Sequence, residues 1–450
     1  MVFTSNAGVL VGQLDQRAAN GQVVNIGTPA SPLAFEPDVN SQYTQADFGL
    51  SSALAKPQGD LNLIAKKFKL PAVFKTSFAA DKKLGKGWTI TTEAIFTKNI
   101  HEVDWQNVNF QLPTLYSNGP DRRLIYSYSG NPTNFVYRPT ATSASARNPY
   151  TNIILIKNTT GQKGFSYNFT VVVDKQSKKG INFNASYTYG SSMVHNEGTS
   201  SINTSNWQNM EAVNDRNNLP LTRSDFDLGH RIFGLISKKF VYAKEHLATT
   251  VAFVYNGQSG SPYSYTMTNR SFIGDAVTFN DLMYVPASRA EMDQMVFLTR
   301  LTGAAATPTA NAADIIAQKD DFEAFINSDK YLSKRRGKYA ERNGARAPFT
   351  HVVDMSITQD FSLKTGATRH TLSVRFDMFN FTNFISKSAG RQYFFNFDQA
   401  TPLSFEGFSG ANPQYKFFKP TGNNPGILSD GTNPFNSSRW TGQLTVRYSF

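Results

Sequence analysis

The chain has 450 residues with 36 Phe, 19 Tyr, 4 Trp and no Cys, and its formal net charge is +12. The lack of cysteine excludes a disulfide scaffold and thiolate metal sites. No apolar run of about 18 residues predicts a transmembrane helix. The basic residues gather on no single face and match no nucleic-acid-binding motif, so we expect no nucleic-acid partner.

Stretches of alternating apolar and polar residues recur in pairs along the chain, each pair joined by a short turn rich in Lys and Gly. About nine strands of membrane length are predicted: 70–81, 88–99, 165–175, 181–190, 225–240, 247–255, 351–361, 371–380 and 439–450. The long connections are residues 110–160, 195–224, 260–348 and 384–438. Short turns at one end and long loops at the other are typical of outer-membrane β-barrels.

Each predicted strand has an apolar and a polar face. In strand 165–175, the alternation runs from Phe165 beside Ser166 to Val173 beside Asp174. A soluble β-sandwich would alternate in the same way, but here charges stand in the middle of the polar faces. A Lys or Arg at the lipid midplane costs about 2–4 kcal/mol, so we predict that these charges face a barrel lumen. They are Lys75, Glu93, Asp174, Arg231, Asp354, Arg375, Asp377 and Arg447.

Aromatic residues near the strand ends fit an interfacial girdle, as at Trp88, Tyr187, Tyr189 and Trp440. His230 stands on the apolar positions of its strand and is expected near an interface. The fold class is therefore all-β, a transmembrane antiparallel β-barrel with long extracellular loops.

The number of predicted strands indicates whether the chain forms a whole barrel. The last strand follows a long loop and is expected to end at the periplasm, so strand 70–81 runs in the same direction. Residues 1–69 would then form an extracellular loop region before the first complete strand, and residues 70–450 the barrel strands and loops. Single-chain bacterial barrels have even strand numbers. Nine strands thus predict a fragment, or half, of a larger barrel.

Two features of the long loops suggest binding. The last loop is rich in aromatic residues that suit ligand capture, and packing of the loops into a cap is the favoured alternative. The candidate ligand contacts are Tyr393, Phe395, Phe397, Tyr415 and Phe417. A basic run at Lys334, Arg335 and Arg336 suits lipopolysaccharide phosphates or an anionic substrate, with a solvated charged face as the favoured alternative. Residues 320–340 are expected to hold a short helix.

Residues for catalysis are not evident. The six histidines are scattered, and phosphate-loop, nucleophile-elbow and dinucleotide motifs are missing. Asp225 and Asp227 flank a loop end, where contact with a cation is a weaker alternative to hydrogen bonding. We predict neither catalytic nor metal-binding residues and no cofactor, and hence no enzyme.

Several segments resemble a known family over residues 61–450. They include "SSRWTGQLTVRYSF", "SVRFDMFNFTNF" and "DKYLSKRRGKYAERNGARAPFTHVVDMSITQDF". Together they are similar to the Oar-like branch of TonB-dependent receptors. The resemblance implies a 22-stranded barrel plugged by an N-terminal domain, with a TonB-contacting segment ahead of it; neither is found in this sequence. It also implies that the barrel-assembly machinery reads the closing strand at Leu444, Val446, Tyr448 and Phe450.

The resemblance implies active import across the outer membrane of a Gram-negative bacterium. The chain would supply the C-terminal barrel part of a TonB-dependent transporter, and a ligand not identified by the sequence would bind the extracellular loops. Outer-membrane lipid and lipopolysaccharide, the barrel-assembly machinery, and TonB through the N-terminal region are the expected partners. The alternative is an adhesive or structural surface protein anchored in the outer membrane without active transport.

Overall fold

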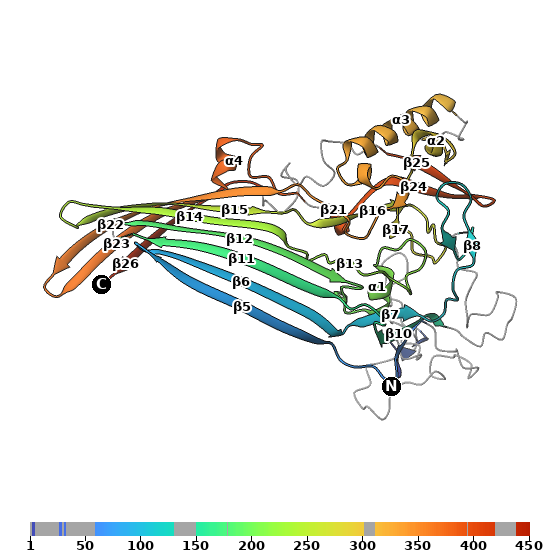
Figure 1. The fold of residues 1–450 in the computed structure, drawn as a ribbon, viewed down its shortest axis with the longest axis horizontal. Coiled ribbons are helices and arrows are strands. Elements are labelled where there is room, and N and C mark those ends of the chain that lie inside the picture. Colours follow the sequence, from blue (N-terminus) through green and yellow to red (C-terminus); the bar gives the residue numbers. More distant parts are fainter. Residues whose placement is uncertain are drawn as a thin grey trace.

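The computed structural model describes residues 2–4, 27–28, 31–32, 59–129, 150–177, 179–300, 311–393, 395–418 and 438–450. A sheet of long strands extends along the molecule, and the long connections fold together at one end of it (Figure 1). We call this end the cap and the opposite end, with the short turns, the turn end. Most of the predicted loop region 1–69 lies outside the described residues. The helices of the described part are too short or too polar to cross a membrane.

The long sheet contains the predicted strands. They are β5 (Ala72–Gly85), β6 (Trp88–His101), β11 (Phe165–Gln176), β12 (Ile181–Val194), β14 (Gly229–Tyr242), β15 (Leu247–Gln258), β22 (Thr350–Thr365), β23 (Thr368–Phe379) and β26 (Thr441–Ser449). Consecutive strands pair antiparallel, with β5 and β26 at the edges, and short β13 (Thr222–Arg223) adds to β12. The predicted boundaries hold within about four residues. The largest differences are four residues. β14 begins after a turn closed by Asp227 N–H donating to Ser224 O, and β5, β12 and β22 run four residues further than predicted.

The strands are strongly staggered. The strand register places one row of directly opposite residues across seven strands: Lys82, Ile90, Val173, Ala185, Gly234, Tyr255 and Val353. Lys82 is four residues from its turn at Lys86, whereas Val353 is thirteen residues from Gly366. The difference is about 30 Å along the strands over about 29 Å across them, which is a tilt of roughly 45°. Outer-membrane barrels have strands tilted by about this angle.

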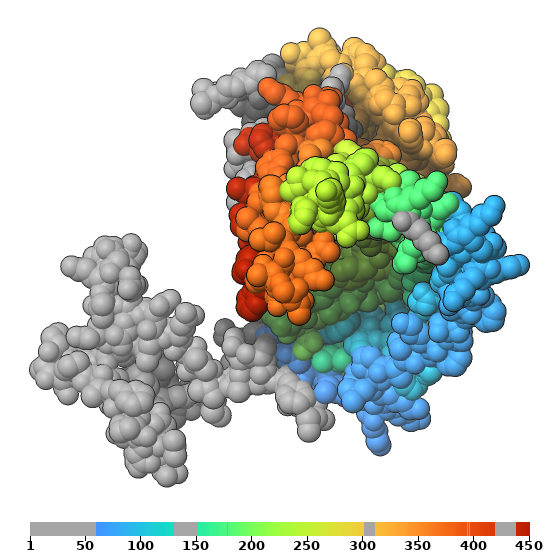
Figure 2. All heavy atoms as spheres, turned by 90° about the vertical axis from the view of Figure 1, so that its left-hand side faces the viewer, coloured from blue at the N-terminus to red at the C-terminus, as the bar shows by residue number. Residues whose placement is uncertain are grey.

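One face of this sheet is apolar and exposed. Phe78, Phe169, Ile236, Phe376 and Leu444 are all exposed large apolar residues on it. In a soluble sandwich such a face would be covered by a second sheet. Figure 2, viewed from the turn end, shows the strands curving around a recess, with β5 and β6 (blue) opposite β22 and β23 (orange).

The cap contains short strands and helices from all four long connections, together with short strands from the residues that precede β5. Its strands are β1 (Val2–Thr4), β4 (Gly59–Ile64), β7 (Val103–Asn107), β8 (Leu115–Tyr116), β9 (Leu124–Ile125), β10 (Tyr150–Asn158), β16 (Pro262–Thr268), β17 (Asp281–Leu282), β18 (Tyr284–Val285), β19 (Val296–Phe297), β20 (Lys338–Tyr339), β21 (Ala345–Arg346), β24 (Gln399–Ser409) and β25 (Asn412–Phe417); β2 (Gly27–Thr28) and β3 (Ser31–Pro32) pair separately. Its helices are α1 (Asn203–Gln208), α2 (Arg289–Asp293), α3 (Ala312–Ser328) and the 3₁₀ turns Leu332–Lys334 and Asn396–Asp398. The short helix α4 (Phe381–Ile385) follows β23.

Pairing between different connections joins the cap into one unit. β16 pairs in parallel with β24, and β19 pairs in parallel with β25, so the third and fourth connections share a sheet. The aromatic side chains beneath this sheet form the largest buried cluster, which includes Phe272, Phe322, Phe405, Tyr415 and Phe417.

The helix predicted within residues 320–340 is present in part: residues 320–328 are helical, but the helix starts eight residues before the predicted segment. Helix α3 begins at Ala312, where the Asn311 side chain accepts a hydrogen bond from Asp314 N–H at 3.2 Å. It ends at Ser328, and the Asp329 carboxylate then caps the backbone N–H groups of Tyr331 and Leu332. The cap signal at Asn311 is local, whereas the prediction followed the later apolar spacing, which includes residues beyond the helix.

Candidate functional site

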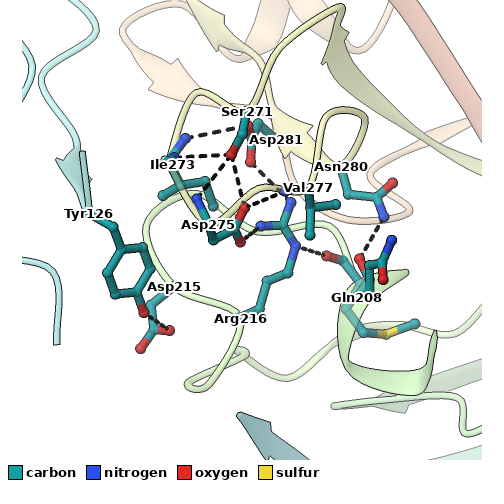
Figure 3. A network of polar contacts seen from close by, with 12 residues as sticks. Tyr126, Gln208, Asp215, Arg216, Ser271, Ile273, Asp275, Val277, Asn280 and Asp281 are labelled. Atoms are coloured by element: carbon teal, nitrogen blue, oxygen red, sulfur yellow. Dashed lines mark hydrogen bonds and ion pairs between the residues drawn. The ribbon is translucent and has the colours of Figure 1, made fainter. Parts of the chain in front are cut away.

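A buried arginine joins the second and third long connections within the cap. The Arg216 guanidinium is fully buried and donates to the carboxylates of Asp275 and Asp281, and to Met210 O at 3.1 Å. Figure 3 shows Arg216 between the two carboxylates, with the Tyr126 hydroxyl donating to Asp215 nearby. Burial raises the pKa of Asp281 to about 6 against the opposing charge of Arg216. The network fixes the relative positions of these two connections.

A second buried arginine acts in the same way on the first connection. The Arg123 guanidinium donates to both oxygens of Asp121 at 2.8 Å and to Leu282 O at 2.8 Å. It stacks over the Phe272 ring, 4.4 Å from the ring centre, and the Tyr415 hydroxyl donates to Asp121 at 3.2 Å. Because Tyr415 comes from the fourth connection, all four loops are tied together.

Two cavities lie in this cap and share the side chains of Glu211 and Arg342 as a common wall. The larger, of about 720 Å³, we call the apolar cleft, because its wall is mostly apolar, with Leu124, Leu219 and Leu282 among its lining residues. The smaller, of about 470 Å³, we call the acidic cavity. Both volumes are typical of small-molecule binding sites.

Carboxylates dominate the acidic cavity. Its lining includes Glu197, Glu211, Asp225 and Asp398, with Arg342 as the one basic residue of the lining. Arg342 directs its donors elsewhere, to Val194 O at 2.8 Å, His195 O at 2.5 Å and Thr222 Oγ1 at 2.7 Å. The cavity therefore carries a surplus of negative charge in a chain with a net charge of +12.

The pKa values of three of these carboxylates are shifted in the same direction. Burial raises the pKa of Glu211 in spite of the nearby Arg342 charge, and burial also raises the pKa of Glu197. Burial and the charge of Asp225 raise the pKa of Asp398 to about 6. A cation placed among these groups would lower each of the three pKa values, so the arrangement favours binding of a positively charged group.

Aromatic rings stand at the same cavity. Phe279 and Phe397 both line it, and Phe397 is 93 % exposed. Phe397 also has a left-handed backbone, with φ of 54°. Exposed ring faces beside carboxylates suit organic cations, which gain from cation–π contacts. Among the described residues, no three His, Asp or Glu side chains converge to hold a metal ion.

The five aromatic residues predicted to contact a ligand have different surroundings in the structure. Tyr415 and Phe417 are fully buried in the aromatic cluster, so packing replaces ligand contact as the role of these two residues. Phe395 is almost buried and stacks on Tyr263 with ring centres 3.8 Å apart, and Tyr393 packs against the same cluster. Of the five residues, Phe397 lines the acidic cavity.

The three basic residues 334–336 also differ in their surroundings. Arg336 donates to the Glu323 carboxylate at 2.5 Å, and Arg335 donates to Tyr339 O and pairs with Glu341 at 2.8 Å. Both guanidinium groups thus hold the cap together, although Arg335 also lines the apolar cleft. Lys334 is exposed and forms no ion pair with the described residues.

The eight predicted lumen charges share one face of the long sheet. The register puts Lys75, Glu93, Asp174 and Arg231 on the face opposite Phe169, and the same holds for Asp354, Arg375, Asp377 and Arg447. Arg375 and Asp377 form an ion pair at 2.7 Å. That this face lines a lumen stays a prediction.

The four residues of the predicted assembly signal project from β26 at the sheet edge. Leu444, Val446, Tyr448 and Phe450 are all exposed on the apolar face, and the Tyr448 hydroxyl contacts His370 Nδ1 at 2.7 Å. Sequence reasoning missed Glu197, Glu211 and Asp398 as site residues. Single carboxylates in separate loops carry no spacing signal, whereas Asp225 had been considered for cation contact.

Comparison with known proteins agrees with this architecture. A sequence profile described as the outer membrane β-barrel domain matches residues 2–390. No curated protein and no solved structure matches the chain. The match covers most of the chain, including eight of the nine long strands, and the tilted sheet with its exposed apolar face has the geometry that such a domain requires. The chain belongs to the outer membrane β-barrel domain family and resides in the outer membrane of a Gram-negative bacterium.

Proposed function

We propose that this chain forms the barrel wall and the ligand-capturing cap of a TonB-dependent outer-membrane transporter. The ligand binds in the cap on the extracellular side and then passes along the polar face of the sheet. TonB, acting through the N-terminal region of the transporter, supplies the energy for release. The observation that carries the proposal is the pair of adjoining cavities built by loops from different hairpins.

The two cavities together suggest the chemistry of the ligand. The apolar cleft accommodates an apolar body, and the acidic cavity accommodates a cationic group near Glu211. Because Glu211 belongs to both walls, one ligand can contact both cavities at this point. An amphipathic organic cation, such as a short basic peptide with aromatic residues, fits this combination.

The closing strand also has a proposed role. Leu444, Val446, Tyr448 and Phe450 are recognised by the barrel-assembly machinery, which inserts the protein into the outer membrane. Their support is the exposed position of all four side chains on β26, which is the edge strand of the sheet within the described part of the chain.

Uptake by living cells tests the transporter. The gene is deleted from the source bacterium and restored, and entry of a fluorescent Lys-Trp-Lys-Trp peptide into the periplasm is measured. We expect entry to require the gene and to stop when a protonophore collapses the proton-motive force. A Glu-Trp-Glu-Trp peptide serves as the control and should not enter.

The alternative is an adhesin anchored in the outer membrane. The buried ion pairs of the cap favour it, because they hold the loops of the cap in one arrangement that a protein partner could recognise. Gene-dependent binding of the peptide at the cell surface, with no protonophore-sensitive entry, would support this alternative and reject active transport.

A further inference from the structure

Cations and histidines on the apolar face of the long sheet fall into two belts. The belt near the turn end contains Lys82, Lys175 and Lys238. Lys175 Nζ lies 4.3 Å from the centre of the Trp88 ring, and Lys238 donates to Lys179 O at 2.5 Å. Lysines in these positions reach the membrane interface while their stems stay in the apolar region.

The second belt lies nearer to the cap and contains Lys98, His230 and His351. The Tyr187 hydroxyl contacts His230 Nδ1 at 2.7 Å, and the Tyr255 hydroxyl contacts His351 Nδ1 at 2.8 Å. From the strand register and the tilt, the two belts are roughly 20–25 Å apart along the membrane normal. This separation matches the apolar band of an outer-membrane barrel, which is about 25 Å tall.

Helix α4 lies at the level of the second belt, on the apolar side of the sheet. The Phe381 ring contacts Phe253, which belongs to the apolar face, with ring centres 6.2 Å apart. Met378, on the same face at the end of β23, is buried. Figure 1 shows α4 standing out from the strands at a distance from helices α1, α2 and α3. The helix is therefore separate from the cap and borders the membrane.

The outer side of α4 combines exposed apolar residues with cations. Phe384 and Ile385 are 54 % and 69 % exposed, and Phe384 meets the exposed Trp440 edge-on with ring centres 5.2 Å apart. Asn380 Nδ2 donates to Gly390 O at 2.9 Å and to Ser438 O, which ties α4 to the start of β26. The nearby cations are Lys387, Arg391 and Arg439, and the segments 380–393 and 438–442 contain no acidic residue.

We propose that α4 is an in-plane anchor that binds the lipopolysaccharide of the outer leaflet. Phe384 and Ile385 insert among the acyl chains, and Lys387, Arg391 and Arg439 bind the phosphate groups of lipid A. The apolar residues of α4 continue the membrane-facing side of the sheet. Its excess of positive charge lies at the level where the lipid headgroups begin, so it attracts their phosphate groups.

Binding of purified lipid A to the full-length protein, extracted from outer membranes and stripped of lipid, tests the anchor. Fluorescently labelled lipid A is titrated with its two phosphates intact and after their enzymatic removal. For the double variant Lys387→Gln/Arg391→Gln we expect about tenfold weaker binding of intact lipid A, because two charge-assisted contacts are lost. Binding of the dephosphorylated form should stay unchanged.

Matched variants separate the phosphate contacts from general effects. Lys83→Gln/Lys86→Gln removes the same charge at the turn end and should bind intact lipid A like the wild type. Phe384→Ser/Ile385→Ser should weaken binding of both forms of lipid A. Lys387→Arg/Arg391→Lys keeps the charges and should restore wild-type binding, which guards against misfolding as the explanation.

The proposal is overturned if Lys387→Gln/Arg391→Gln binds intact lipid A as tightly as the wild type does. It is equally overturned if the turn-end control weakens binding to the same extent, since the effect would then reflect net charge alone. Loss of binding in the serine variant only would indicate an apolar partner without phosphate recognition, and this result also rejects the anchor as proposed.

Discussion

The long sheet and the cap use the same residue types in opposite ways. Phe78 and Phe169 are exposed on the sheet, whereas Phe272 and Phe417 are fully buried in the cap. Arg375 in the sheet is more than half exposed beside Asp377, while Arg216 in the cap is fully buried between two carboxylates. The sheet thus presents apolar side chains to lipid on one face. The cap buries its apolar side chains in a core, as a water-soluble domain does.

This contrast shows where the stability of each region originates. The sheet depends on the hydrogen-bond ladders between neighbouring strands and on the lipid that covers its apolar face. The cap depends on aromatic packing and on buried ion pairs between segments that are distant in sequence. A substitution should therefore damage one region and leave the other intact.

The largest effect is expected for Arg216→Met. It leaves Asp275 and Asp281 buried without their partner, which should destabilise the cap by about 3–5 kcal/mol. Limited proteolysis should show cleavage in the cap, while the heat-modifiable gel mobility of the barrel stays normal. Arg289→Met, which removes exposed ion pairs with Asp293 and Asp320, is the control and should change little. Loss of the barrel together with the cap would mean that the two regions are not separable.

The next largest effect separates the two faces of the sheet. Val171 lies on the apolar face near the middle of the membrane band, and its neighbour Val172 lies on the polar face. Val171→Lys should cost about 2–4 kcal/mol, measured by reversible unfolding into urea from lipid vesicles. Val172→Lys should cost clearly less, because its ammonium group faces the charged side. Equal costs for the two variants would contradict the assignment of the faces.

Acidity should weaken ligand binding by the cap. Asp398 has a pKa raised to about 6, so its carboxylate is charged at pH 7 and mostly protonated at pH 5. Affinity for the Lys-Trp-Lys-Trp peptide should fall about fivefold over this range, the effect of roughly 1 kcal/mol in a partly exposed site. Asp398→Asn should have low affinity at both pH values, and Asp293→Asn should keep the wild-type profile. Fluorescence titration measures these affinities.

The raised pKa of Asp398 also makes the stability of the folded cap depend on pH. A raised pKa means that the folded cap binds the proton more tightly than the unfolded chain does. The stability contributed by protonated Asp398 is therefore complete below pH 3.8 and is lost as the pH rises through about 6. Unfolding of the cap at pH 5 and 7 in the wild type and in Asp398→Asn measures this contribution. Greater stability of the wild type at pH 7 than at pH 5, absent from the variant, would contradict it.

The smallest effect concerns the exposed ring at the acidic cavity. Phe397→Asn should leave cap stability nearly unchanged, because the ring is exposed and asparagine tolerates a left-handed backbone. Affinity for the peptide should drop about two- to fivefold through the lost cation–π contact. Phe226→Asn removes another exposed ring that does not line the cavity, and it should bind like the wild type. Equal losses in both variants would exclude a specific contact at Phe397.

Much of the sheet could be predicted from the sequence, because its pattern is local. A period of two within each strand indicates both the strand and its faces, and short turns between strands set the pairing of neighbours. The eight polar-face charges and the apolar residues of β26 were found in this way. The structure added the stagger of the strands, which depends on the register across the whole sheet.

The cap was decided by tertiary structure. The parallel pairing of β16 with β24 and the partners of Arg216 connect loops separated by many residues, and no period in the sequence marks them. Glu197, Glu211 and Asp398 come from different loops and form one cavity only after folding. A membrane-spanning strand must alternate apolar residues toward lipid with polar residues on the other face, and this alternation is visible in its sequence. The core of the cap has no such repeating pattern, because its contacts depend on which distant segments of the chain pack together.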